Sequence, residues 1–418
     1  MPTTKKQHYV PRFYMKPFSI IANPGTKKEK VLISFYNFNK NIIRKNVPVM
    51  SVCAEDFFYG KDGVTENKLA EKEKKWAKVI SKINHGREPM EIEIDDIKEF
   101  MIYQISRTKV ILDHNREMFT VISTAIVSNQ SPEADKDMVK EVVGKKVEGE
   151  ITSEYNLSFV TETLPVVADL KFCILENKTN NFFITSDAPV IVVNPLGYHN
   201  AGLANIGTVV FFPVSPQKMV MFYDGKLYEK IMGEIYDPDC IDAFNKYQYL
   251  SADEMILARE SVDFMKYIQE KELRTFRKRF HIESKTSTSS DNNRGTFIAV
   301  KSRTVEYCID IPLLKLPKVL RKIPRDFRDT FPRKYSVKTR WAILCRIYGE
   351  AKFNQNYWKK AQKYARIMLP YLDYYWNTPS EDCALSGDDM RRLKATSVQF
   401  IPKEGAISNE FLSSDRME

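Results

Sequence analysis

The pattern of hydrophobic and polar positions predicts a strand pair followed by a helix in the first part of the chain. Residues 31–38 are β-branched and aromatic, 39–41 are turn-forming Asn and Lys, and 42–44 resume with two isoleucines, which is typical of a β-hairpin. Thr65 is the expected N-cap of a helix of about five turns that ends at Gly86. The apolar face of this helix consists of Leu69, Trp76, Val79, Ile80 and Ile83.

A second long helix is expected to begin near Asp95 and to extend toward Val127. Apolar residues between Phe100 and Phe119 recur on one face of this stretch, as an amphipathic helix requires. Residues 128–154 are charged and poor in aromatic residues, which favours a weak helix or an insertion.

From Leu170 onward the spacing of apolar residues becomes typical of strands. The expected strands are 170–175, 182–185, 208–212 and 219–223, and the expected helices are 239–249 and 252–267. The first two strands are joined by a polar turn and should form a second hairpin. Strands and helices that do not alternate strictly favour an α+β fold, in which a mixed or antiparallel sheet with hairpins packs against long amphipathic helices.

A polar, Ser-rich stretch at 284–295 has the composition of a linker. The predicted organisation is an α+β domain at 1–283, a linker at 284–295, a basic and partly helical extension at 296–382, and a polar tail at 383–418.

The charge of the chain is concentrated after this linker. Lys and Arg number 64 against 54 Asp and Glu, a formal net charge of +10, which suggests phosphate-rich partners. Residues 314–340 hold ten Lys and Arg against two Asp, with aromatic residues between them. Arginines neutralise phosphates and aromatic rings stack on bases, so we expect nucleic acid to bind at Arg321, Lys322, Arg325 and Arg328. The alternative is a solvated surface whose aromatic residues pack on the main domain.

Several classes of protein are not indicated. No secretion signal follows the first lysines, the apolar runs are too short to span a membrane, and the six cysteines are widely separated. We therefore expect a cytoplasmic protein with reduced thiols and no membrane partner. The chain has neither a phosphate-binding Walker loop nor a dinucleotide fingerprint, and its 15 glycines are few, so ATP-driven or hydride chemistry is not expected.

Residues 7–14 read QHYVPRFY, and three further patches accompany them. These are Glu66 with Leu69 and Glu73, Gln104 with Arg107 and Thr108, and FITSDAP at 183–189 followed by FPVSP at 212–216; Asn245 is a weaker fourth match. Together they resemble a bacterial family of unknown function with an N-terminal QHYVPRFYL signature. Met15 stands in place of the last Leu, and Lys109 stands where the family usually has Pro. The resemblance covers about the first two-thirds of the chain. It points to particular residue positions but implies no reaction.

The polar residues of these patches form the candidate site: His8, Arg12, Glu66, Glu73, Gln104, Arg107 and Asp187. Polar side chains beside core elements are costly unless they pair or perform chemistry. One hypothesis is a hydrolytic site in which Asp187, Glu73 and His8 bind Mg²⁺ or Mn²⁺. In that site Glu66 and Arg107 would join the catalysis, and Arg12 and Gln104 would bind the substrate.

The other hypothesis is structural, with arginines neutralising Glu66 and Glu73 in an internal network. Seven residues of helix separate the two glutamates by about 10.5 Å, so they are not expected to share one metal ion. Asp187 also lies in a sequence that favours a turn, where an aspartate bonds to the backbone.

Two further nuclease patterns are present. Asp169, Glu176 and Lys178 match the residue types of a restriction-type nuclease. Arg107 and His114, seven positions apart on one expected helix, resemble the Arg and His pair of metal-independent HEPN-type ribonucleases.

The sequence thus leads to one main functional expectation and two alternatives. The first is a nucleic-acid hydrolase that cleaves phosphodiesters with a metal ion, in bacterial phage defence or a toxin role. The alternatives are a non-catalytic binding or sensor protein with a structural polar network, and a metal-independent ribonuclease using Arg107 and His114. Convergence of His8, a glutamate and Asp187 in one open cleft favours the first, whereas a closed, paired network favours the second. The substrate and the oligomeric state stay open.

Overall fold

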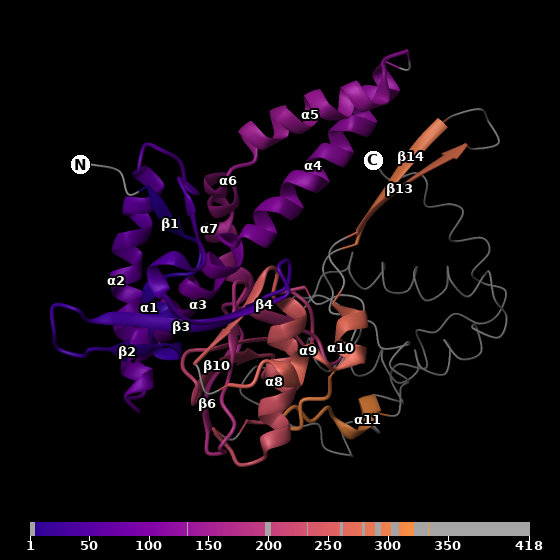
Figure 1. Ribbon diagram of the computed structural model, residues 1–418. Coiled ribbons are helices and arrows are strands. Elements are labelled where there is room, and N and C mark those ends of the chain that lie inside the picture. The colour runs from indigo at the N-terminus through magenta and orange to yellow at the C-terminus, as the bar shows by residue number, and fades with distance from the viewer. Residues whose placement is uncertain are drawn as a thin grey trace. The chain divides into compact units, whose positions relative to one another are not determined.

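The structure is a computed structural model that describes residues 5–131, 133–196, 202–231, 233–259, 262–277, 281–288, 294–301, 309–321 and 333. The chain divides into two compact units, one of residues 1–193, 209–223 and 232–313 and one of residues 194–208, 224–231 and 314–418. The sheets and long helices belong to the first unit (Figure 1).

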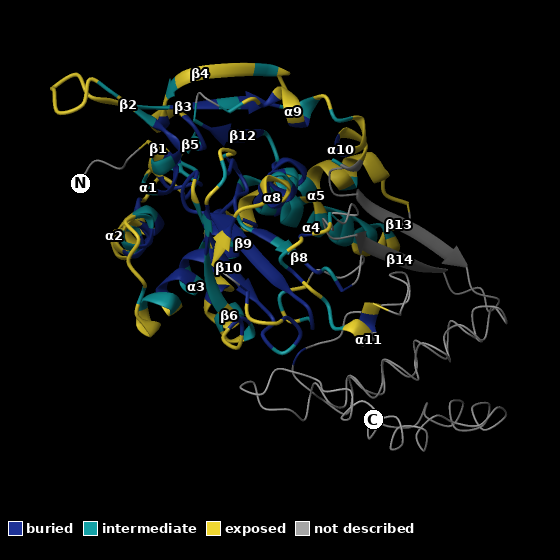
Figure 2. Cartoon of the chain, turned by 90° about the horizontal axis from the view of Figure 1, so that it is seen from below, coloured by how far each residue is buried: buried dark blue, intermediate teal, exposed yellow. Residues whose placement is uncertain are grey.

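One five-stranded sheet of the first unit has the strand order β11-β6-β10-β9-β8. In that order the strands are Glu234–Ile235, Lys171–Asn177, Lys218–Tyr223, Val209–Pro213 and Ile191–Val193. All pairs are antiparallel except β11 with β6. The adjacent strands β9 and β10 are the strands expected at 208–212 and 219–223, and they lie in the buried centre of the view in Figure 2.

The second five-stranded sheet has the order β2-β3-β12-β7, with β4 also paired to β3. Its strands are β2 (Ile20–Ala22), β3 (Lys30–Asn37), β4 (Ile42–Pro48), β7 (Thr185–Ser186) and β12 (Met255–Ala258). The hairpin predicted at 31–44 is confirmed, because Asn37 pairs with Ile42 across the turn. β4 is the exposed partner of β3 (Figure 2).

Two short sheets complete the strands. β1 (Lys6–His8) pairs with β5 (Ala54–Asp56), and β13 (His281–Thr288) pairs with β14 (Arg294–Lys301). The stretch expected to be a linker at 284–295 overlaps both β13 and β14. The predicted domain boundaries on either side of it stay a prediction.

The helices are α1 (Arg12–Met15), α2 (Val64–Asn84), α3 (Glu91–Ser106), α4 (Lys109–Gln130), α5 (Lys136–Glu150), α6 (Ser153–Ser158), α7 (Val160–Thr163), α8 (Pro238–Ser251), α9 (Met265–Ile268), α10 (Lys271–Phe276) and α11 (Lys318–Arg321). Short 3-10 turns are η1 (Lys16–Phe18), η2 (Val49–Ser51) and η3 (Leu164–Val166). The apolar face predicted for α2 is buried throughout, and α8 confirms the helix predicted at 239–249. The predicted N-cap is wrong: Gly63, with φ 72°, precedes the helix, and Thr65 is buried inside it.

The long helix expected from Asp95 toward Val127 is two helices, α3 and α4, separated at Arg107 and Thr108. Thr108 has extended backbone angles, φ −72° and ψ 149°, although neither Gly nor Pro marks the break. α4 and α5 pack side by side (Figure 1), with Leu112, Val147 and Ile151 buried between them and their neighbours.

Two other predictions are wrong. β6 pairs with β10 and β11 rather than with residues 182–185, and the helix expected at 252–267 contains β12 instead. A run of four apolar residues, such as β12, fits the period of a strand and that of a helix equally well. Only the pairing partners in the folded chain decide which of the two forms.

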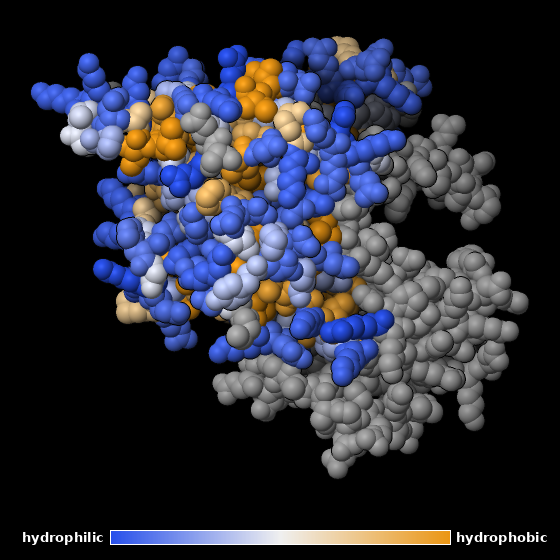
Figure 3. All heavy atoms as spheres, turned by 60° about the horizontal axis from the view of Figure 1, so that its bottom comes forward, coloured by the Kyte–Doolittle hydropathy of each residue, from blue (hydrophilic) through white to orange (hydrophobic). Residues whose placement is uncertain are grey.

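Aromatic rings join the first sheet to the helices that cover it. Phe100 on α3 lies 5.6 Å from Trp76 on α2, 5.7 Å from Phe212 on β9 and 5.7 Å from Tyr14 on α1, measured between ring centroids. The predicted α+β class, with antiparallel sheets against amphipathic helices, is confirmed. In Figure 3 hydrophilic residues dominate the described part of the face in view, with apolar residues in separate small groups. The predicted basic extension, apart from short pieces such as α11 and Arg333, lies outside the described residues.

Candidate functional site

The N-terminal segment alternates between buried anchors and two polar residues that reach solvent. Gln7, Tyr9 and Tyr14 are buried, whereas His8 is partly exposed and Arg12 is exposed. The Nε2 atom of His8 is nevertheless buried and has no hydrogen-bond partner. The Gln7 side chain accepts a hydrogen bond from the Tyr59 backbone N–H (2.6 Å) and donates one to the Gly60 carbonyl (3.0 Å). The signature-like segment is therefore a scaffold that presents His8 and Arg12.

Arg107 fixes this segment through hydrogen bonds to its backbone. Its side chain has no exposed surface, and its Nη2 donates to Glu73 Oε1 (2.8 Å) and to the His8 carbonyl (3.1 Å). Arg107 Nε and Gln104 Nε2 both donate to the Tyr9 carbonyl, at 3.2 and 3.0 Å. These bonds fix the backbone of the segment, although Arg107 Nη1 and Gln104 Oε1 are buried without a hydrogen-bond partner. We therefore assign Arg107 and Gln104 a positioning role.

Ion pairs also tie α2 to α3, as the structural hypothesis expects. Besides Arg107 with Glu73, they include Lys72 with Glu99 (2.6 Å), Lys82 with Glu93 (2.6 Å) and Lys75 with Asp96. The expected glutamate–arginine bridge between facing helices is confirmed for Glu73. This carboxylate keeps 28% of its side chain exposed, so it is not sealed from solvent.

The pKa values of His8 and Glu66 are shifted in opposite directions. Burial, together with the nearby positive charge of Arg12, lowers the pKa of His8 to about 4, and Arg107 and Lys6 act in the same direction. Burial, and then the neighbouring charge of Glu73, raises the pKa of Glu66 above its usual value, although Arg107 and Arg12 oppose this. At neutral pH the site therefore holds a neutral imidazole, and its carboxyl keeps a proton to higher pH than an ordinary glutamate.

Asp187 follows β7, and its carboxylate accepts hydrogen bonds from backbone N–H groups. It is 4% exposed, and its Oδ1 accepts from the Asp253 N–H (2.9 Å) while its Oδ2 accepts from Glu254 (2.6 Å) and Met255 (3.0 Å). These bonds fix the chain where it enters β12. The aspartate bonds to the backbone, as the turn hypothesis expects, but the N–H groups that it binds lie 66 to 68 positions further along the chain and not in its own turn.

The metal set expected from the sequence is not assembled. Among the described residues, no three His, Cys, Asp or Glu side chains form a group that could hold a metal ion. Asp187 is engaged with the turn before β12, and Glu73 Oε1 is engaged with Arg107. Two members of the expected triad of Asp187, Glu73 and His8 thus have other partners in the fold, and the metal site stays a prediction.

The fold places the residues of the other two patterns differently from what the sequence suggests. Lys178 Nζ pairs with Glu176 Oε1 (2.8 Å) and Glu234 Oε1 (3.5 Å), so these two residues of the nuclease-like pattern form an ion pair at the end of β6. Arg107 caps the C-terminus of α3 and His114 lies on α4, so they do not share a helix as expected.

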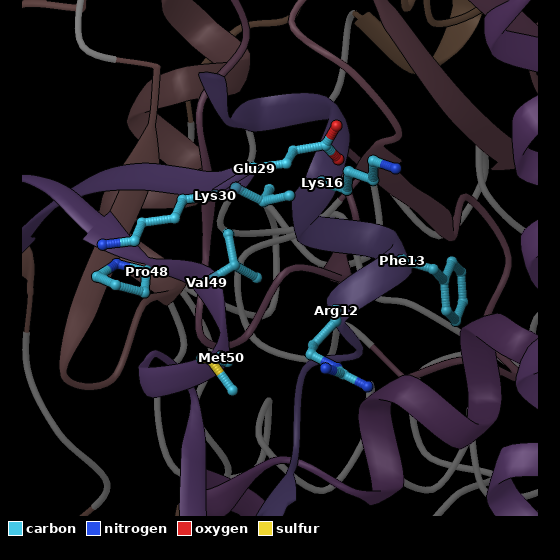
Figure 4. A pocket seen from close by; sticks show the side chains of 9 residues that line it. Arg12, Phe13, Lys16, Glu29, Lys30, Pro48, Val49 and Met50 are labelled. Carbon is cyan, nitrogen blue, oxygen red and sulfur yellow. The ribbon is translucent and has the colours of Figure 1, made fainter. Parts of the chain in front are cut away.

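Sequence reasoning missed two features next to His8. The Tyr59 hydroxyl donates to the His8 carbonyl (3.2 Å), and no pattern in the sequence pointed to it. A pocket of about 370 Å³ opens beside Arg12, with Lys16 and Lys30 as further cationic walls and Phe13, Val49 and Met50 as apolar ones (Figure 4). We call it the Arg12 pocket. Its lysines come from η1 and β3, and only the folded chain brings them together.

Asn245 on α8, the weaker fourth match, joins segments of the core through hydrogen bonds of its side chain. Its amide oxygen accepts from the Ile184 N–H (2.9 Å), and its amide nitrogen donates to the Phe182 carbonyl (2.8 Å) and the Tyr267 hydroxyl (2.9 Å). It therefore fixes the segment that leads into β7 and Asp187.

Comparison with known proteins gives one match. No curated protein and no solved structure matches the chain. Within the described part of the chain, none of the helices combines the length and the apolar character that crossing a membrane requires. The model of a family described as a protein of unknown function, DUF4238, matches residues 6–261 and so includes β1, α2, α3 and Asp187. The chain therefore belongs to the DUF4238 family.

Proposed function

We propose that this protein is a nucleic-acid hydrolase that cleaves phosphodiester bonds by acid–base catalysis at His8, Glu66 and Arg12. One observation carries the proposal: a neutral imidazole and a carboxyl with a raised pKa lie near an exposed arginine, on a scaffold held by buried hydrogen bonds. Perturbed titratable groups of this kind cluster at functional sites.

The proposed reaction is a hydrolysis in which each group has one role. The imidazole of His8 takes a proton from the attacking water, whose oxygen forms the new bond to phosphorus. The bond to the leaving oxygen breaks, and Glu66 gives that oxygen its proton. Arg12 neutralises the non-bridging phosphate oxygens. In the free protein the pair works between the His8 pKa of about 4 and the raised pKa of Glu66. A bound phosphate raises both pKa values and so moves this window toward neutral pH.

The proposed mechanism uses neither Mg²⁺ nor Mn²⁺, for an electrostatic reason. The charges of Arg12, Arg107 and Lys6 that oppose protonation of His8 also oppose a divalent cation at the same place. The remaining carboxylate, Glu73, already compensates Arg107. The donors that the fold leaves here therefore fit a metal ion poorly.

The choice of a polyanionic substrate is supported by the net charge of +10. We propose that the basic extension binds the polymer. Within it, Arg321 Nε donates to the Leu316 carbonyl, and Lys322, Arg325 and Arg328 lie outside the described residues. A cytoplasmic role in phage defence or as a toxin belongs to the same proposal. Cys53, Cys173 and Cys240 are free thiols, as a reducing compartment would leave them.

The proposal is tested by incubating the purified protein with labelled single-stranded RNA, single-stranded DNA and duplex DNA, each with Mg²⁺, Mn²⁺ or EDTA. We expect cleavage that survives EDTA and that falls by about 100-fold or more in His8→Gln and in Glu66→Gln. Glu71→Gln, an exposed change on the same helix, is the matched control and should cleave at the wild-type rate. Circular dichroism checks that the variants fold. Wild-type rates in His8→Gln would refute the assigned roles.

A second candidate is a nucleic-acid-binding or sensor protein without catalysis. It is favoured by the fully buried Arg107, whose bonds to Glu73, His8 and Tyr9 tie the residues of the candidate site to one another. The same assay separates the two candidates. Binding of a nucleic acid that weakens in Arg12→Ala, with none of the three polymers cleaved under any metal condition, would select this second candidate.

A further inference from the structure

Besides the basic extension, the first strands of the chain carry an excess of positive charge. Residues 5–48 contain ten Lys and Arg and a single acid, Glu29, a formal charge of +9 in a chain whose total is +10. Figure 2 shows β4 and the loop that joins β2 to β3 as exposed. We call the six exposed cations of this loop and hairpin the basic sheet surface: Lys27, Lys28, Lys30, Lys40, Arg44 and Lys45.

The charge of the basic sheet surface is not compensated within the protein. In the part of the chain that the structure describes, none of its six cations forms an ion pair, whereas Lys5 on the other side of β2 in the sequence pairs with Asp56 (3.0 Å). Glu29 accepts a hydrogen bond from the Gly25 N–H (2.9 Å) and so closes its own loop. The six cations therefore give up no internal partner when they bind an anion.

The cations are spread along the sheet and do not converge on one point. β3 has eight residues and spans about 26 Å, with Lys30 at its start and Lys40 beyond its end. Arg44 lies between them on β4, since it is opposite Phe35. This spread fits a polymer with closely spaced charges, such as a nucleic-acid strand with a phosphate about every 3.4 Å along a duplex.

The same spread continues toward the candidate site. Lys30 and Lys16 line the Arg12 pocket together with Arg12, and Figure 4 shows the charged ends of these three side chains pointing apart. They are thus suited to successive phosphates of one polymer and not to one small anion.

The backbone of β4 is a poor edge for a peptide strand. Its register with β3 shifts between Ile33 and Phe35, Asn46 has φ 55°, and Pro48 ends the strand. A bulge, a proline and charged side chains are features that prevent a further strand from pairing. Recognition at this surface therefore falls to the side chains, whose charge selects a polyanion.

We infer that the backbone of a nucleic acid lies across the basic sheet surface and continues to Arg12. The choice of nucleic acid among polyanions rests on the proposed function, in which Arg12 neutralises the phosphate that is cleaved. The basic sheet surface then binds the part of the polymer next to the cleaved bond.

Fluorescence anisotropy with labelled duplex DNA at several salt concentrations tests the inference on full-length His8→Gln protein, in which cleavage does not interfere. The added changes K27Q, K28Q, K40Q and K45Q should weaken binding and flatten the slope of log K against log salt by up to about 3.6, at about 0.9 per lost phosphate contact. The matched control K74Q, K78Q, K136Q and K140Q removes four exposed lysines of α2 and α5 and should keep the slope. Equal slopes in the two variants would overturn the inference.

Chemical protection gives a second measurement that needs no variant of the surface. Bound DNA should slow the acetylation of Lys28, Lys30 and Lys45, read by mass spectrometry, and leave that of Lys140 unchanged. Equal acetylation with and without DNA would contradict the inference. Tighter binding of polyglutamate than of DNA to the same lysines would overturn it in favour of an acidic protein.

The two proposals fail in different ways. A slope that flattens as expected, with none of the polymers cleaved by the wild type, supports the surface and removes the proposed hydrolase. Cleavage that depends on His8, with an unchanged slope in the first variant, does the reverse.

Discussion

At the scale of single residues, the candidate site is ordered by how each charge is compensated. Arg107 and Asp187 are both buried and each forms several hydrogen bonds, although Arg107 Nη1 has no hydrogen-bond partner. His8 and Glu66 are partly exposed and Arg12 is exposed, but the Nε2 atom of His8 is buried without a hydrogen-bond partner. Charges that bond to the backbone and to each other mainly hold structure, whereas partly compensated ones are available for chemistry.

Asp187→Ala is expected to lower the free energy of unfolding by about 3 kcal/mol, because three N–H groups at the start of β12 lose a charged acceptor. Urea denaturation at pH 7 measures the change. Glu88→Ala, at an exposed position, should stay within about 0.5 kcal/mol of the wild type. A stable Asp187→Ala protein that has lost hydrolysis would instead return this aspartate to the catalytic residues.

The lowered pKa of His8 predicts a pH dependence of stability. Its pKa is about 4 in the folded protein against 6.5 ordinarily, so the unfolded chain binds more protons between these values. The free energy of unfolding should therefore fall as the pH is lowered from about 6.5 to 4. In His8→Gln this contribution is missing and the fall should be shallower, whereas His85→Gln, at an exposed histidine, should keep the wild-type slope. Urea denaturation at several pH values decides, and parallel curves for wild type and His8→Gln would contradict the expectation.

At the scale of elements, the break between α3 and α4 matters most for the site. The backbone turns at Arg107 and Thr108, so that Arg107 ends α3 beside the carbonyls of His8 and Tyr9. α2 then supplies Glu73 as the counter-charge. A continuous helix would leave the N-terminal segment without these bonds.

The helix pair of α4 and α5 allows a test of element stability. Gly144 lies inside α5, and a Cβ added there would meet only Thr120 Cγ2, at 4.0 Å. Gly144→Ala should raise the free energy of unfolding by about 0.5–1 kcal/mol, because glycine costs conformational entropy in a helix. Gly207→Ala is the contrasting variant: its φ is +82° and the added Cβ would lie 2.7 Å from Asn194 Oδ1, so it should destabilise. Thermal unfolding compares both, and a lower Tm for Gly144→Ala would contradict the packing of α5.

At the scale of the whole molecule, the family match and the basic extension lie in different parts of the chain. DUF4238 matches residues 6–261, which include the candidate site, whereas the basic stretch at 314–340 lies beyond the match. Within the second unit, Arg333 donates from its backbone to the Ala204 carbonyl (2.7 Å) and from its side chain to Leu203 (2.6 Å) and Asn205 (3.0 Å). Arg333 thus anchors the extension to residues 203–205, a loop that lies within the matched region.

Neutralising the basic extension should weaken nucleic-acid binding and reduce its salt dependence. The quadruple variant R321Q, K322Q, R325Q and R328Q should flatten the slope of log K against log salt by up to about 3.6, from about 0.7–0.9 per lost phosphate contact. A matched variant with four exposed lysines changed, K74Q, K78Q, K136Q and K140Q, has the same net charge and should keep the slope. Fluorescence anisotropy at several salt concentrations measures both, and an unchanged slope in the first variant would remove the extension from the account.

Elements with a long or repeated pattern were predictable. The apolar face of α2, the β3–β4 hairpin, the strands β9 and β10 and the helix α8 all follow from periodicity and turn residues, because those signals are local. Short elements were not predictable. β7 and β12 consist of two and four residues, and their pairing joins segments about 70 positions apart.

The amino-acid sequence by itself determined the fold class, the family and the set of polar residues from which the site is drawn. Only the tertiary structure decided which of them are anchors and which are available, since that depends on partners far along the chain. Asp187 finds its N–H groups at 253–255, and Arg107 finds its acceptors at His8, Tyr9 and Glu73. Burial and hydrogen bonding are properties of these long-range neighbours, so the roles of the charged residues became visible only once the chain was folded.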